Sequence, residues 1–134
     1  MLSSAWKLNL EYDLNGDSLK LFDIDKLLVS AENDEKWADE ILVLFIKDVA
    51  DRLDTVKELL SVNEPDMSML RLHFHTIKSS SGSVGAVLLG EKAFVLEKAA
   101  KNNDLELIRN SVDFFGDIFK KSITEFEKRI KREL

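Results

Sequence analysis

The sequence contains no cysteine and a single proline among its 134 residues. Without cysteine the chain can form neither a disulfide framework nor a thiolate metal site, which agrees with a reducing compartment. The longest apolar run, residues 41–46, is far shorter than a membrane span, and residues 1–20 lack the basic start and long apolar centre of a signal peptide. We therefore expect a cytoplasmic chain that does not insert into a membrane.

The sequence also has no excess of basic residues. Its net charge is −6, whereas binding to nucleic acid or to an anionic membrane relies on clustered lysine and arginine. We therefore expect no nucleic-acid partner. A hydrophobic content of 45% over 134 residues suffices for one domain with a core, and the chain is too short for two.

Apolar residues recur at helical spacing through the first half of the chain. Residues 23–25 can cap a short helix that ends near Ala31, and a long helix is expected over residues 34–62. The inner stripe of the long helix consists of Leu42, Phe45, Val49, Leu53, Val56 and Leu60. We expect Pro65 to lie in the first turn of the next helix, where its missing N–H costs nothing.

The second half of the chain predicts three further helices. One ends at Val84, a shorter one ends near Lys101, and the last begins after an N-cap at Asp104. The apolar stripe of the last helix consists of Leu105, Ile108, Val112, Phe115, Phe119, Ser122, Phe126 and Ile130. Four long amphipathic helices with short connections predict an all-α fold, an antiparallel up-down-up-down four-helix bundle with a short extra N-terminal helix over one end.

Residues 1–21 form an N-terminal extension ahead of the bundle domain, which we place at residues 22–134. Apolar and polar side chains alternate from Trp6 to Tyr12, and Asn15-Gly16 follows. This pattern is typical of a small β-hairpin. A partly ordered linker remnant explains the same residues equally well, and both interpretations remain open.

Both histidines of the chain lie in one predicted helix. The core stripe of that helix consists of Leu70, Phe74, Ile77, Ser81 and Val84. At about 100° per residue, His75 points roughly 140° away from the middle of the stripe, and His73 about 60°. His75 is therefore expected to be exposed, and His73 to pack or hydrogen-bond at the flank. Because the two side chains point in nearly opposite directions, they cannot share one metal ion.

The surroundings of His75 favour phosphoryl transfer. Lys78 lies one turn away on the same face, where its charge can compensate phosphate oxygens. An exposed nucleophile beside a cation, on a surface with few large side chains, suits transfer of a phosphoryl group to another protein. The residues expected to bind that partner are Arg71, Leu72, Ser79 and Gly82.

Other chemistry of this segment can be excluded. Ser79, Ser80 and Ser81 do not lie in the Gly-x-Ser-x-Gly turn of a serine nucleophile. Lys78-Ser79 is not preceded by the Gly-x-x-x-x-Gly of a phosphate-binding loop. The sequence therefore offers no ATP site, and the chain is not expected to phosphorylate itself.

The segment from His75 to Gly85 resembles the signature of histidine-containing phosphotransfer (HPt) domains of two-component multistep phosphorelays. In that family a histidine is followed at plus three by lysine and at plus ten by glycine, as His75, Lys78 and Gly85 are here. The similarity extends from about residue 22 to residue 131. One departure is Ser79, because the family usually has glycine at plus four.

The resemblance implies a phosphoryl shuttle. His75 would be the phosphoacceptor, exchanging the group through Nε2 with aspartates of response-regulator receiver domains, and Lys78 would balance its charge. The chain would bind no cofactor, and the receiver would supply Mg²⁺. The family often has a Gln or Glu that hydrogen-bonds the other imidazole nitrogen, and Glu97 stands at the matching distance. A solvated glutamate beside Lys98 explains Glu97 equally well.

Two alternatives remain open at the level of the sequence. A helical adaptor bundle that binds receiver or kinase domains without carrying phosphate would tolerate the loss of His75. The chain could also be the C-terminal domain of a hybrid sensor histidine kinase instead of a free-standing carrier. In each case we expect a monomer whose partners are response-regulator receiver domains and a sensor histidine kinase.

Overall fold

The computed structural model describes residues 21–133, with side chains through residue 128. The described chain forms five helices: α2 (Ile24–Ser30), α3 (Glu35–Leu59), α4 (Met67–Val84), α5 (Val87–Lys101) and α6 (Leu105–Glu133). It contains no strand. The N-terminal extension at residues 1–21, interpreted as either a small hairpin or a linker remnant, falls almost entirely outside the described residues.

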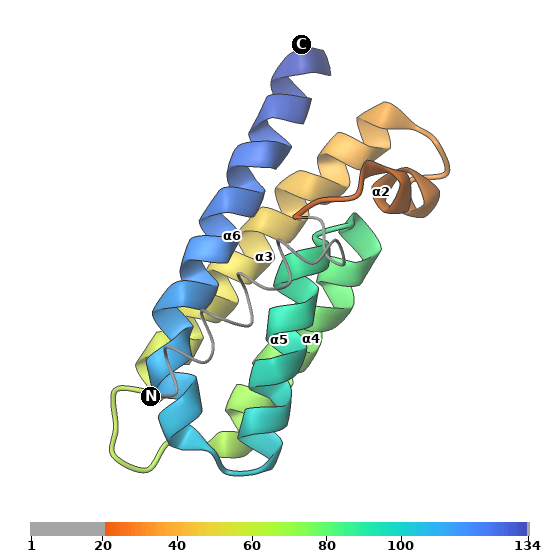
Figure 1. Ribbon diagram of the computed structural model, residues 1–134. Coiled ribbons are helices and arrows are strands. Elements are labelled where there is room, and N and C mark those ends of the chain that lie inside the picture. Colours follow the sequence, from red (N-terminus) through yellow and green to blue (C-terminus); the bar gives the residue numbers. More distant parts are fainter. Residues whose placement is uncertain (1–20, 134) are drawn as a thin grey trace.

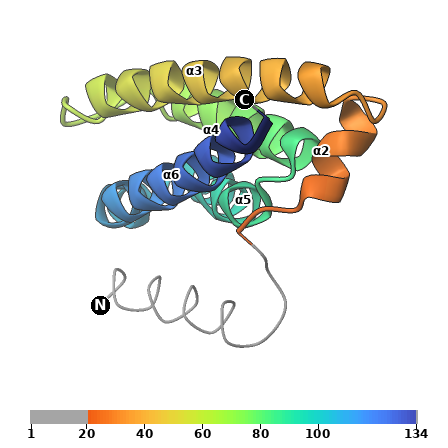
Figure 2. The same cartoon turned by 90° about the horizontal axis from the view of Figure 1, so that it is seen from above.

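The four long helices α3 to α6 run alternately up and down and pack side by side (Figure 1). The short helix α2 lies across the end of the bundle where α4 passes into α5 (Figures 1 and 2). This arrangement confirms the predicted all-α antiparallel bundle with an extra N-terminal helix. No helix in residues 21–133 is long and apolar enough to cross a membrane.

Aspartate side chains start three of the long helices. The carboxylates of Asp34, Asp66 and Asp104 each accept a hydrogen bond of 3.1 Å from the backbone N–H three residues later. The cap at Asp104 is thereby confirmed. The placement of Pro65 inside the first turn of α4 was wrong, because Asp66 is the N-cap and the helix begins at Met67.

The end of α3 also differs from the prediction, since the helix stops at Leu59 instead of continuing to Val62. The Ser61 hydroxyl donates a 2.6 Å hydrogen bond to the Glu58 carbonyl and helps to tighten the last turn. Beyond it, Arg109 of α6 donates to the carbonyls of Leu60 and Val62. The guanidinium thus satisfies carbonyls that a longer helix would have paired internally.

The predicted stripes form most of the core. The residues of the α3 stripe are buried except Leu60, which is half-buried. In α6, Ile118 and Ser111 are buried in addition to Ile108, Phe115, Phe119, Ser122 and Phe126, while Leu105 and Val112 are only half-buried. The side chain of Ile130, also in the predicted stripe, lies outside the described residues. The stripe of α6 is shifted and widened because this helix contacts both α3 and α5.

Helices α4 and α5 approach each other closely because small residues meet between them. A Cβ atom added to Gly90 would lie 3.3 Å from Cβ of Ser81. The backbones can therefore come together with no large side chain in between. As a result, the outer surfaces of α4 and α5 adjoin, and side chains from both helices can meet there.

Helix α2 is fastened to the turn between α4 and α5. The Asp23 N–H donates a 2.8 Å hydrogen bond to the Gly85 carbonyl, and the Ser30 hydroxyl donates a 2.6 Å bond to the Ser83 carbonyl. Gly85 has φ +83°, and a Cβ there would overlap the Asp23 carbonyl oxygen. Glycine is therefore required at this position by both conformation and space.

Candidate functional site

The two histidines of α4 lie in different surroundings. The His75 side chain is 56% exposed on the outer surface of the helix, whereas His73 is half-buried at the flank. These exposures match the positions that helical periodicity predicts for the two residues. Only His75 offers an imidazole to an approaching protein.

His75 is hydrogen-bonded to Glu97 of α5. The distance between His75 Nδ1 and Glu97 Oε2 is 2.8 Å. Because an ionised carboxylate can only accept hydrogen bonds, Nδ1 carries the proton of the neutral imidazole. The lone pair of the ring is then on Nε2, which is the chemically reactive nitrogen in this arrangement.

Glu97 also pairs with Lys78 of α4. The distance between Lys78 Nζ and Glu97 Oε1 is 2.8 Å, so one carboxylate bridges the ammonium and the imidazole. Glu97 is 12% exposed and Lys78 33% exposed. Burial on its own raises the pKa of Glu97, but the hydrogen bonds from Lys78 and His75 outweigh it, and the net pKa lies below its ordinary value. Glu97 is therefore ionised at neutral pH.

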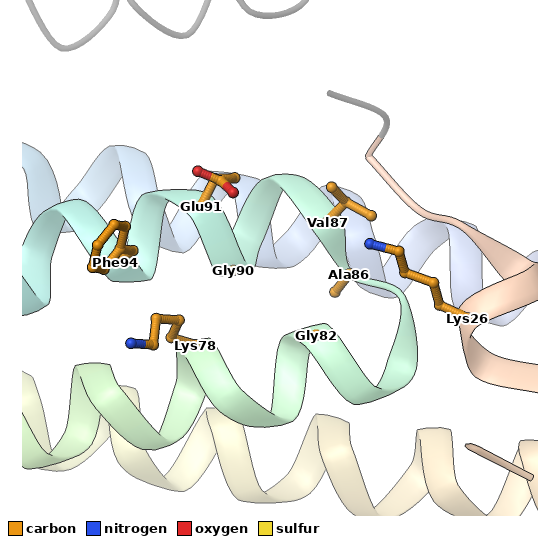
Figure 3. Close-up of a pocket in the computed structure, with 8 residues that line it drawn as sticks. All are labelled: Lys26, Lys78, Gly82, Ala86, Val87, Gly90, Glu91 and Phe94. Atoms are coloured by element: carbon orange, nitrogen blue, oxygen red, sulfur yellow. The ribbon is translucent and has the colours of Figure 1, made fainter. Parts of the chain in front are cut away.

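The ammonium of Lys78 has a further neighbour, Phe94, which was not predicted from the sequence. It lies 4.9 Å from the centre of the Phe94 ring, and Lys98 Nζ lies 4.3 Å from the same ring centre. Figure 3 shows Lys78 on α4 and Phe94 on α5 beside each other. A sequence signal existed, since Phe94 precedes Glu97 by three residues and Lys98 by four, the spacings at which side chains on a helix are neighbours.

The residues predicted to bind a partner surround His75 at the surface. Arg71, Leu72, Ser79 and Gly82 are all exposed, and a Cβ added to Gly82 would meet no atom within 4 Å. We call these four residues, together with His75, the docking face. The surface at the docking face is hollowed beside His75. A hollow of about 390 Å³ is lined by Ser68, Arg71, Leu72, His75 and Glu97.

A second hollow lies toward α2. It measures about 260 Å³ and is drawn in Figure 3. It is lined by Lys26, Lys78, Gly82, Ala86, Val87, Gly90, Glu91 and Phe94. Lys26 comes from α2, which the sequence did not connect with this surface.

His73 is held in a separate network with α3. Its Nδ1 lies 3.2 Å from Arg52 Nη1, and since a guanidinium only donates, Nδ1 accepts. Its Nε2 is buried. Burial and the nearby Arg52 charge lower the pKa of His73, and Asp48, which pairs with Arg52 at 2.9 Å, opposes this. His73 is therefore neutral at pH 7, and neither ring nitrogen is available to an external phosphoryl group.

Metal coordination was not predicted for this chain. Among the described residues, no group of three or more His, Asp or Glu side chains is placed so that it could hold a metal ion. The acidic group next to His75 is Glu97, which is engaged by Lys78 and by the imidazole itself.

Comparison with known proteins agrees with the geometry around His75. The family model of the Hpt domain matches residues 40–132. Among solved structures, histidine-containing phosphotransfer protein B from Pseudomonas aeruginosa PAO1 is similar, with a TM-score of 0.77 and 25% identity. The similarity covers 86% of this chain and 98% of that one. No curated protein sequence gives a significant match.

Helix α2 and the first residues of α3 precede the matched range, yet they belong to the same core, since Leu27 and Ala31 are buried.

Hpt domains interact with kinases and response regulators in phosphorelays. The match extends over more than half of the chain and includes α4, α5 and nearly all of α6. The chain therefore belongs to the Hpt domain family, and its function is histidine phosphotransfer in a phosphorelay.

Proposed function

We propose that His75 is the residue that carries the phosphoryl group, and that it does so on Nε2. The observation that carries this proposal is the 2.8 Å hydrogen bond between Nδ1 and Glu97 on a side chain that is 56% exposed. The bond fixes both the ring orientation and the tautomer, and it directs the lone pair of Nε2 away from the carboxylate. His73 offers neither of these features.

In the proposed step, the Nε2 lone pair forms a bond to phosphorus while the P–O bond to a receiver aspartate breaks. The electron pair of that bond leaves with the aspartate carboxylate. Nδ1 keeps its proton, so the phosphorylated ring carries a positive charge that the Glu97 carboxylate balances. The reverse step passes the group to the aspartate of a second receiver. Such transfers depend mainly on positioning and charge compensation.

Lys78 supplies charge compensation from this chain. A phosphoryl group brings roughly two negative charges, and a lysine ammonium has three N–H donors. One donor of Lys78 is directed to Glu97, at 2.8 Å. The remaining donors are free to approach phosphoryl oxygens on Nε2. In this proposal the chain itself binds no cofactor, and Mg²⁺ belongs to the receiver.

The proposed partners are response-regulator receiver domains, as donor and acceptor, together with the sensor histidine kinase that feeds them. We propose that the chain acts as a monomer, since His75, Lys78 and Glu97 come from α4 and α5 of one chain. The lack of cysteine suits a reducing compartment, and we place the protein in the cytoplasm. The docking face around His75 would contact the receiver.

The proposal is tested by incubating the protein with purified receiver domains that carry radiolabelled phosphoaspartate. The parent should acquire an acid-labile, alkali-stable label. His75→Gln should abolish the label and His73→Gln should retain it, while circular dichroism shows both variants to be helical. Label that persists in His75→Gln, or that disappears only in His73→Gln, would overturn the assignment.

A further inference from the structure

Lys78 contacts the aromatic ring of Phe94, a contact that is not needed for compensating the charge of a phosphoryl group. Its ammonium lies 4.9 Å from the centre of the Phe94 ring, a distance at which the negative face of an aromatic ring attracts a cation. Phe94 is on α5, three residues before Glu97, so the ring and the carboxylate lie on one side of that helix. The Lys78 side chain extends from α4 toward both groups.

The exposure of Phe94 argues that the ring is not simply part of the core. Phe94 remains 39% exposed, whereas the core positions of α5 are buried. Figure 3 shows the ring on α5 next to Lys78 of α4, and both residues line the 260 Å³ hollow. A large aromatic side chain at this place has Lys78 and Lys98 as its charged neighbours.

We propose that Phe94 is a positioning residue, which keeps the Lys78 ammonium beside His75 while the phosphoryl group is transferred. The proposal rests on the function proposed for His75. A phosphoryl group on Nε2 would engage the donors of Lys78 that Glu97 leaves free, and the ammonium would shift toward its oxygens. The flexible four-carbon stem of lysine would then allow the ammonium to move away into solvent. The Phe94 ring attracts the charge independently of the oxygen acceptors, so it restrains Lys78 throughout the exchange.

Lys98 provides the competing explanation, because its ammonium lies even closer to the ring, at 4.3 Å. Lys98 follows Phe94 by four residues on α5 and is exposed. If the ring positioned Lys98 instead of Lys78, any effect of removing the ring on transfer would require Lys98 and not Lys78. The two cases are separable, since each lysine can be removed without changing Phe94.

The experiment measures the rate of phosphoryl transfer from a phosphorylated receiver, at saturating receiver, together with the Kd for the unphosphorylated receiver. The variants are Phe94→Leu, which keeps apolar bulk, and Phe94→Tyr, which keeps the ring. Each is made in the parent and in Lys78→Ala. Phe94→Leu should slow transfer about threefold, the factor that corresponds to an exposed cation–π contact. Phe94→Tyr should restore the rate, and in Lys78→Ala the change to leucine should have no further effect.

Other outcomes contradict the proposal in distinct ways. If Phe94→Leu weakens receiver binding and does so equally in Lys78→Ala, the ring is a docking contact and does not position Lys78. If Lys98→Gln slows transfer as much as Phe94→Leu, the ring acts through Lys98. If His75→Gln still accepts the label, the function proposed for His75 fails, and this result does not depend on any Phe94 variant.

Discussion

At the scale of single residues, Glu97 is the group that contacts both His75 and Lys78. Its two carboxylate oxygens bind different partners, the imidazole of His75 and the ammonium of Lys78, each at 2.8 Å. The same carboxylate therefore sets the tautomer of the His75 imidazole and the resting position of the Lys78 ammonium. Since the hydrogen bonds lower the pKa of Glu97, both effects persist throughout the neutral range.

His73, on the same helix as His75, should make the free energy of unfolding depend on pH. Its pKa in the folded protein lies below the ordinary value of 6.5, chiefly because of burial. Below pH 6.5 the unfolded chain therefore binds more protons at this residue than the folded chain does. The contribution of His73 to the free energy of unfolding is complete above pH 6.5 and declines as the pH falls, with a slope of at most about 1.4 kcal/mol per pH unit.

This dependence can be measured by urea unfolding of the parent and of His73→Gln between about pH 7.5 and about pH 5. The parent should lose stability relative to the variant as the solution becomes more acidic. A difference that does not change with pH, or a parent that gains relative stability in acid, would show that the folded protein does not hold His73 in the neutral form.

Some residues of the site could be predicted from the sequence and others could not. The exposure of His75 follows from its angle to the core stripe, which depends only on helix geometry. The position of Glu97 was suggested by family resemblance, since the distance between residues on two helices depends on how the helices pack. Phe94 was missed for the same reason, because its partner Lys78 lies on the neighbouring helix.

At the scale of helices, the turn between α4 and α5 determines how the two halves of the site meet. Gly85 allows the left-handed conformation that ends α4, and its carbonyl binds α2 through the Asp23 N–H. The small residues Ser81 and Gly90 then let α5 run back close to α4. Glu97 is thereby brought within hydrogen-bond distance of His75.

Gly85→Ala should destabilise the protein by at least about 2 kcal/mol. A left-handed conformation costs an alanine about 1 to 2 kcal/mol, and its Cβ would also displace Asp23. Gly82→Ala is the matched control, because its Cβ meets nothing and alanine favours helix by about 1 kcal/mol. Thermal unfolding should show a lower Tm only for Gly85→Ala. Equal Tm values for Gly85→Ala and the parent would contradict this description of the turn.

The helices themselves were predictable because each has a continuous stripe at helical spacing. The residues at which the helices begin and end were harder to predict. Pro65 pointed to a helix start, but Asp66 has the carboxylate that accepts the Met69 N–H and therefore sets the boundary. The carbonyls of Leu60 and Val62, just beyond α3, accept hydrogen bonds from Arg109, a residue of α6 that sequence reasoning could not pair with them.

At the scale of the whole molecule, the buried core and the proposed docking face lie on different sides of the helices. The core lies among the inner stripes of the helices, while the docking face consists of exposed residues around His75, of which Ser79 and Gly82 have little or no side chain. Ser79 stands where the family usually has glycine, and it is exposed as well. A larger side chain on this face should therefore obstruct a partner without disturbing the fold.

Ser79→Arg and Gly82→Leu test this separation. Both should leave the Tm near that of the parent, and both should slow transfer from a receiver at least tenfold, about 1.4 kcal/mol. Lys128→Glu on α6 serves as the control, because Lys128 is 63% exposed and outside the docking face. Calorimetric titration with a receiver would reveal an interface elsewhere if the control lost binding while the two bulky variants retained it.

The most direct test of phosphorylation at His75 is NMR of the phosphorylated protein with nitrogen-15 in its histidines. Coupling between phosphorus and nitrogen identifies the bonded atom, and the proton on the second nitrogen is observed in the same sample. We predict coupling to Nε2 of His75, with a proton on Nδ1 that is lost from view or shifted in Glu97→Ala. Coupling to Nδ1 of His75, or to either nitrogen of His73, would contradict the assignment.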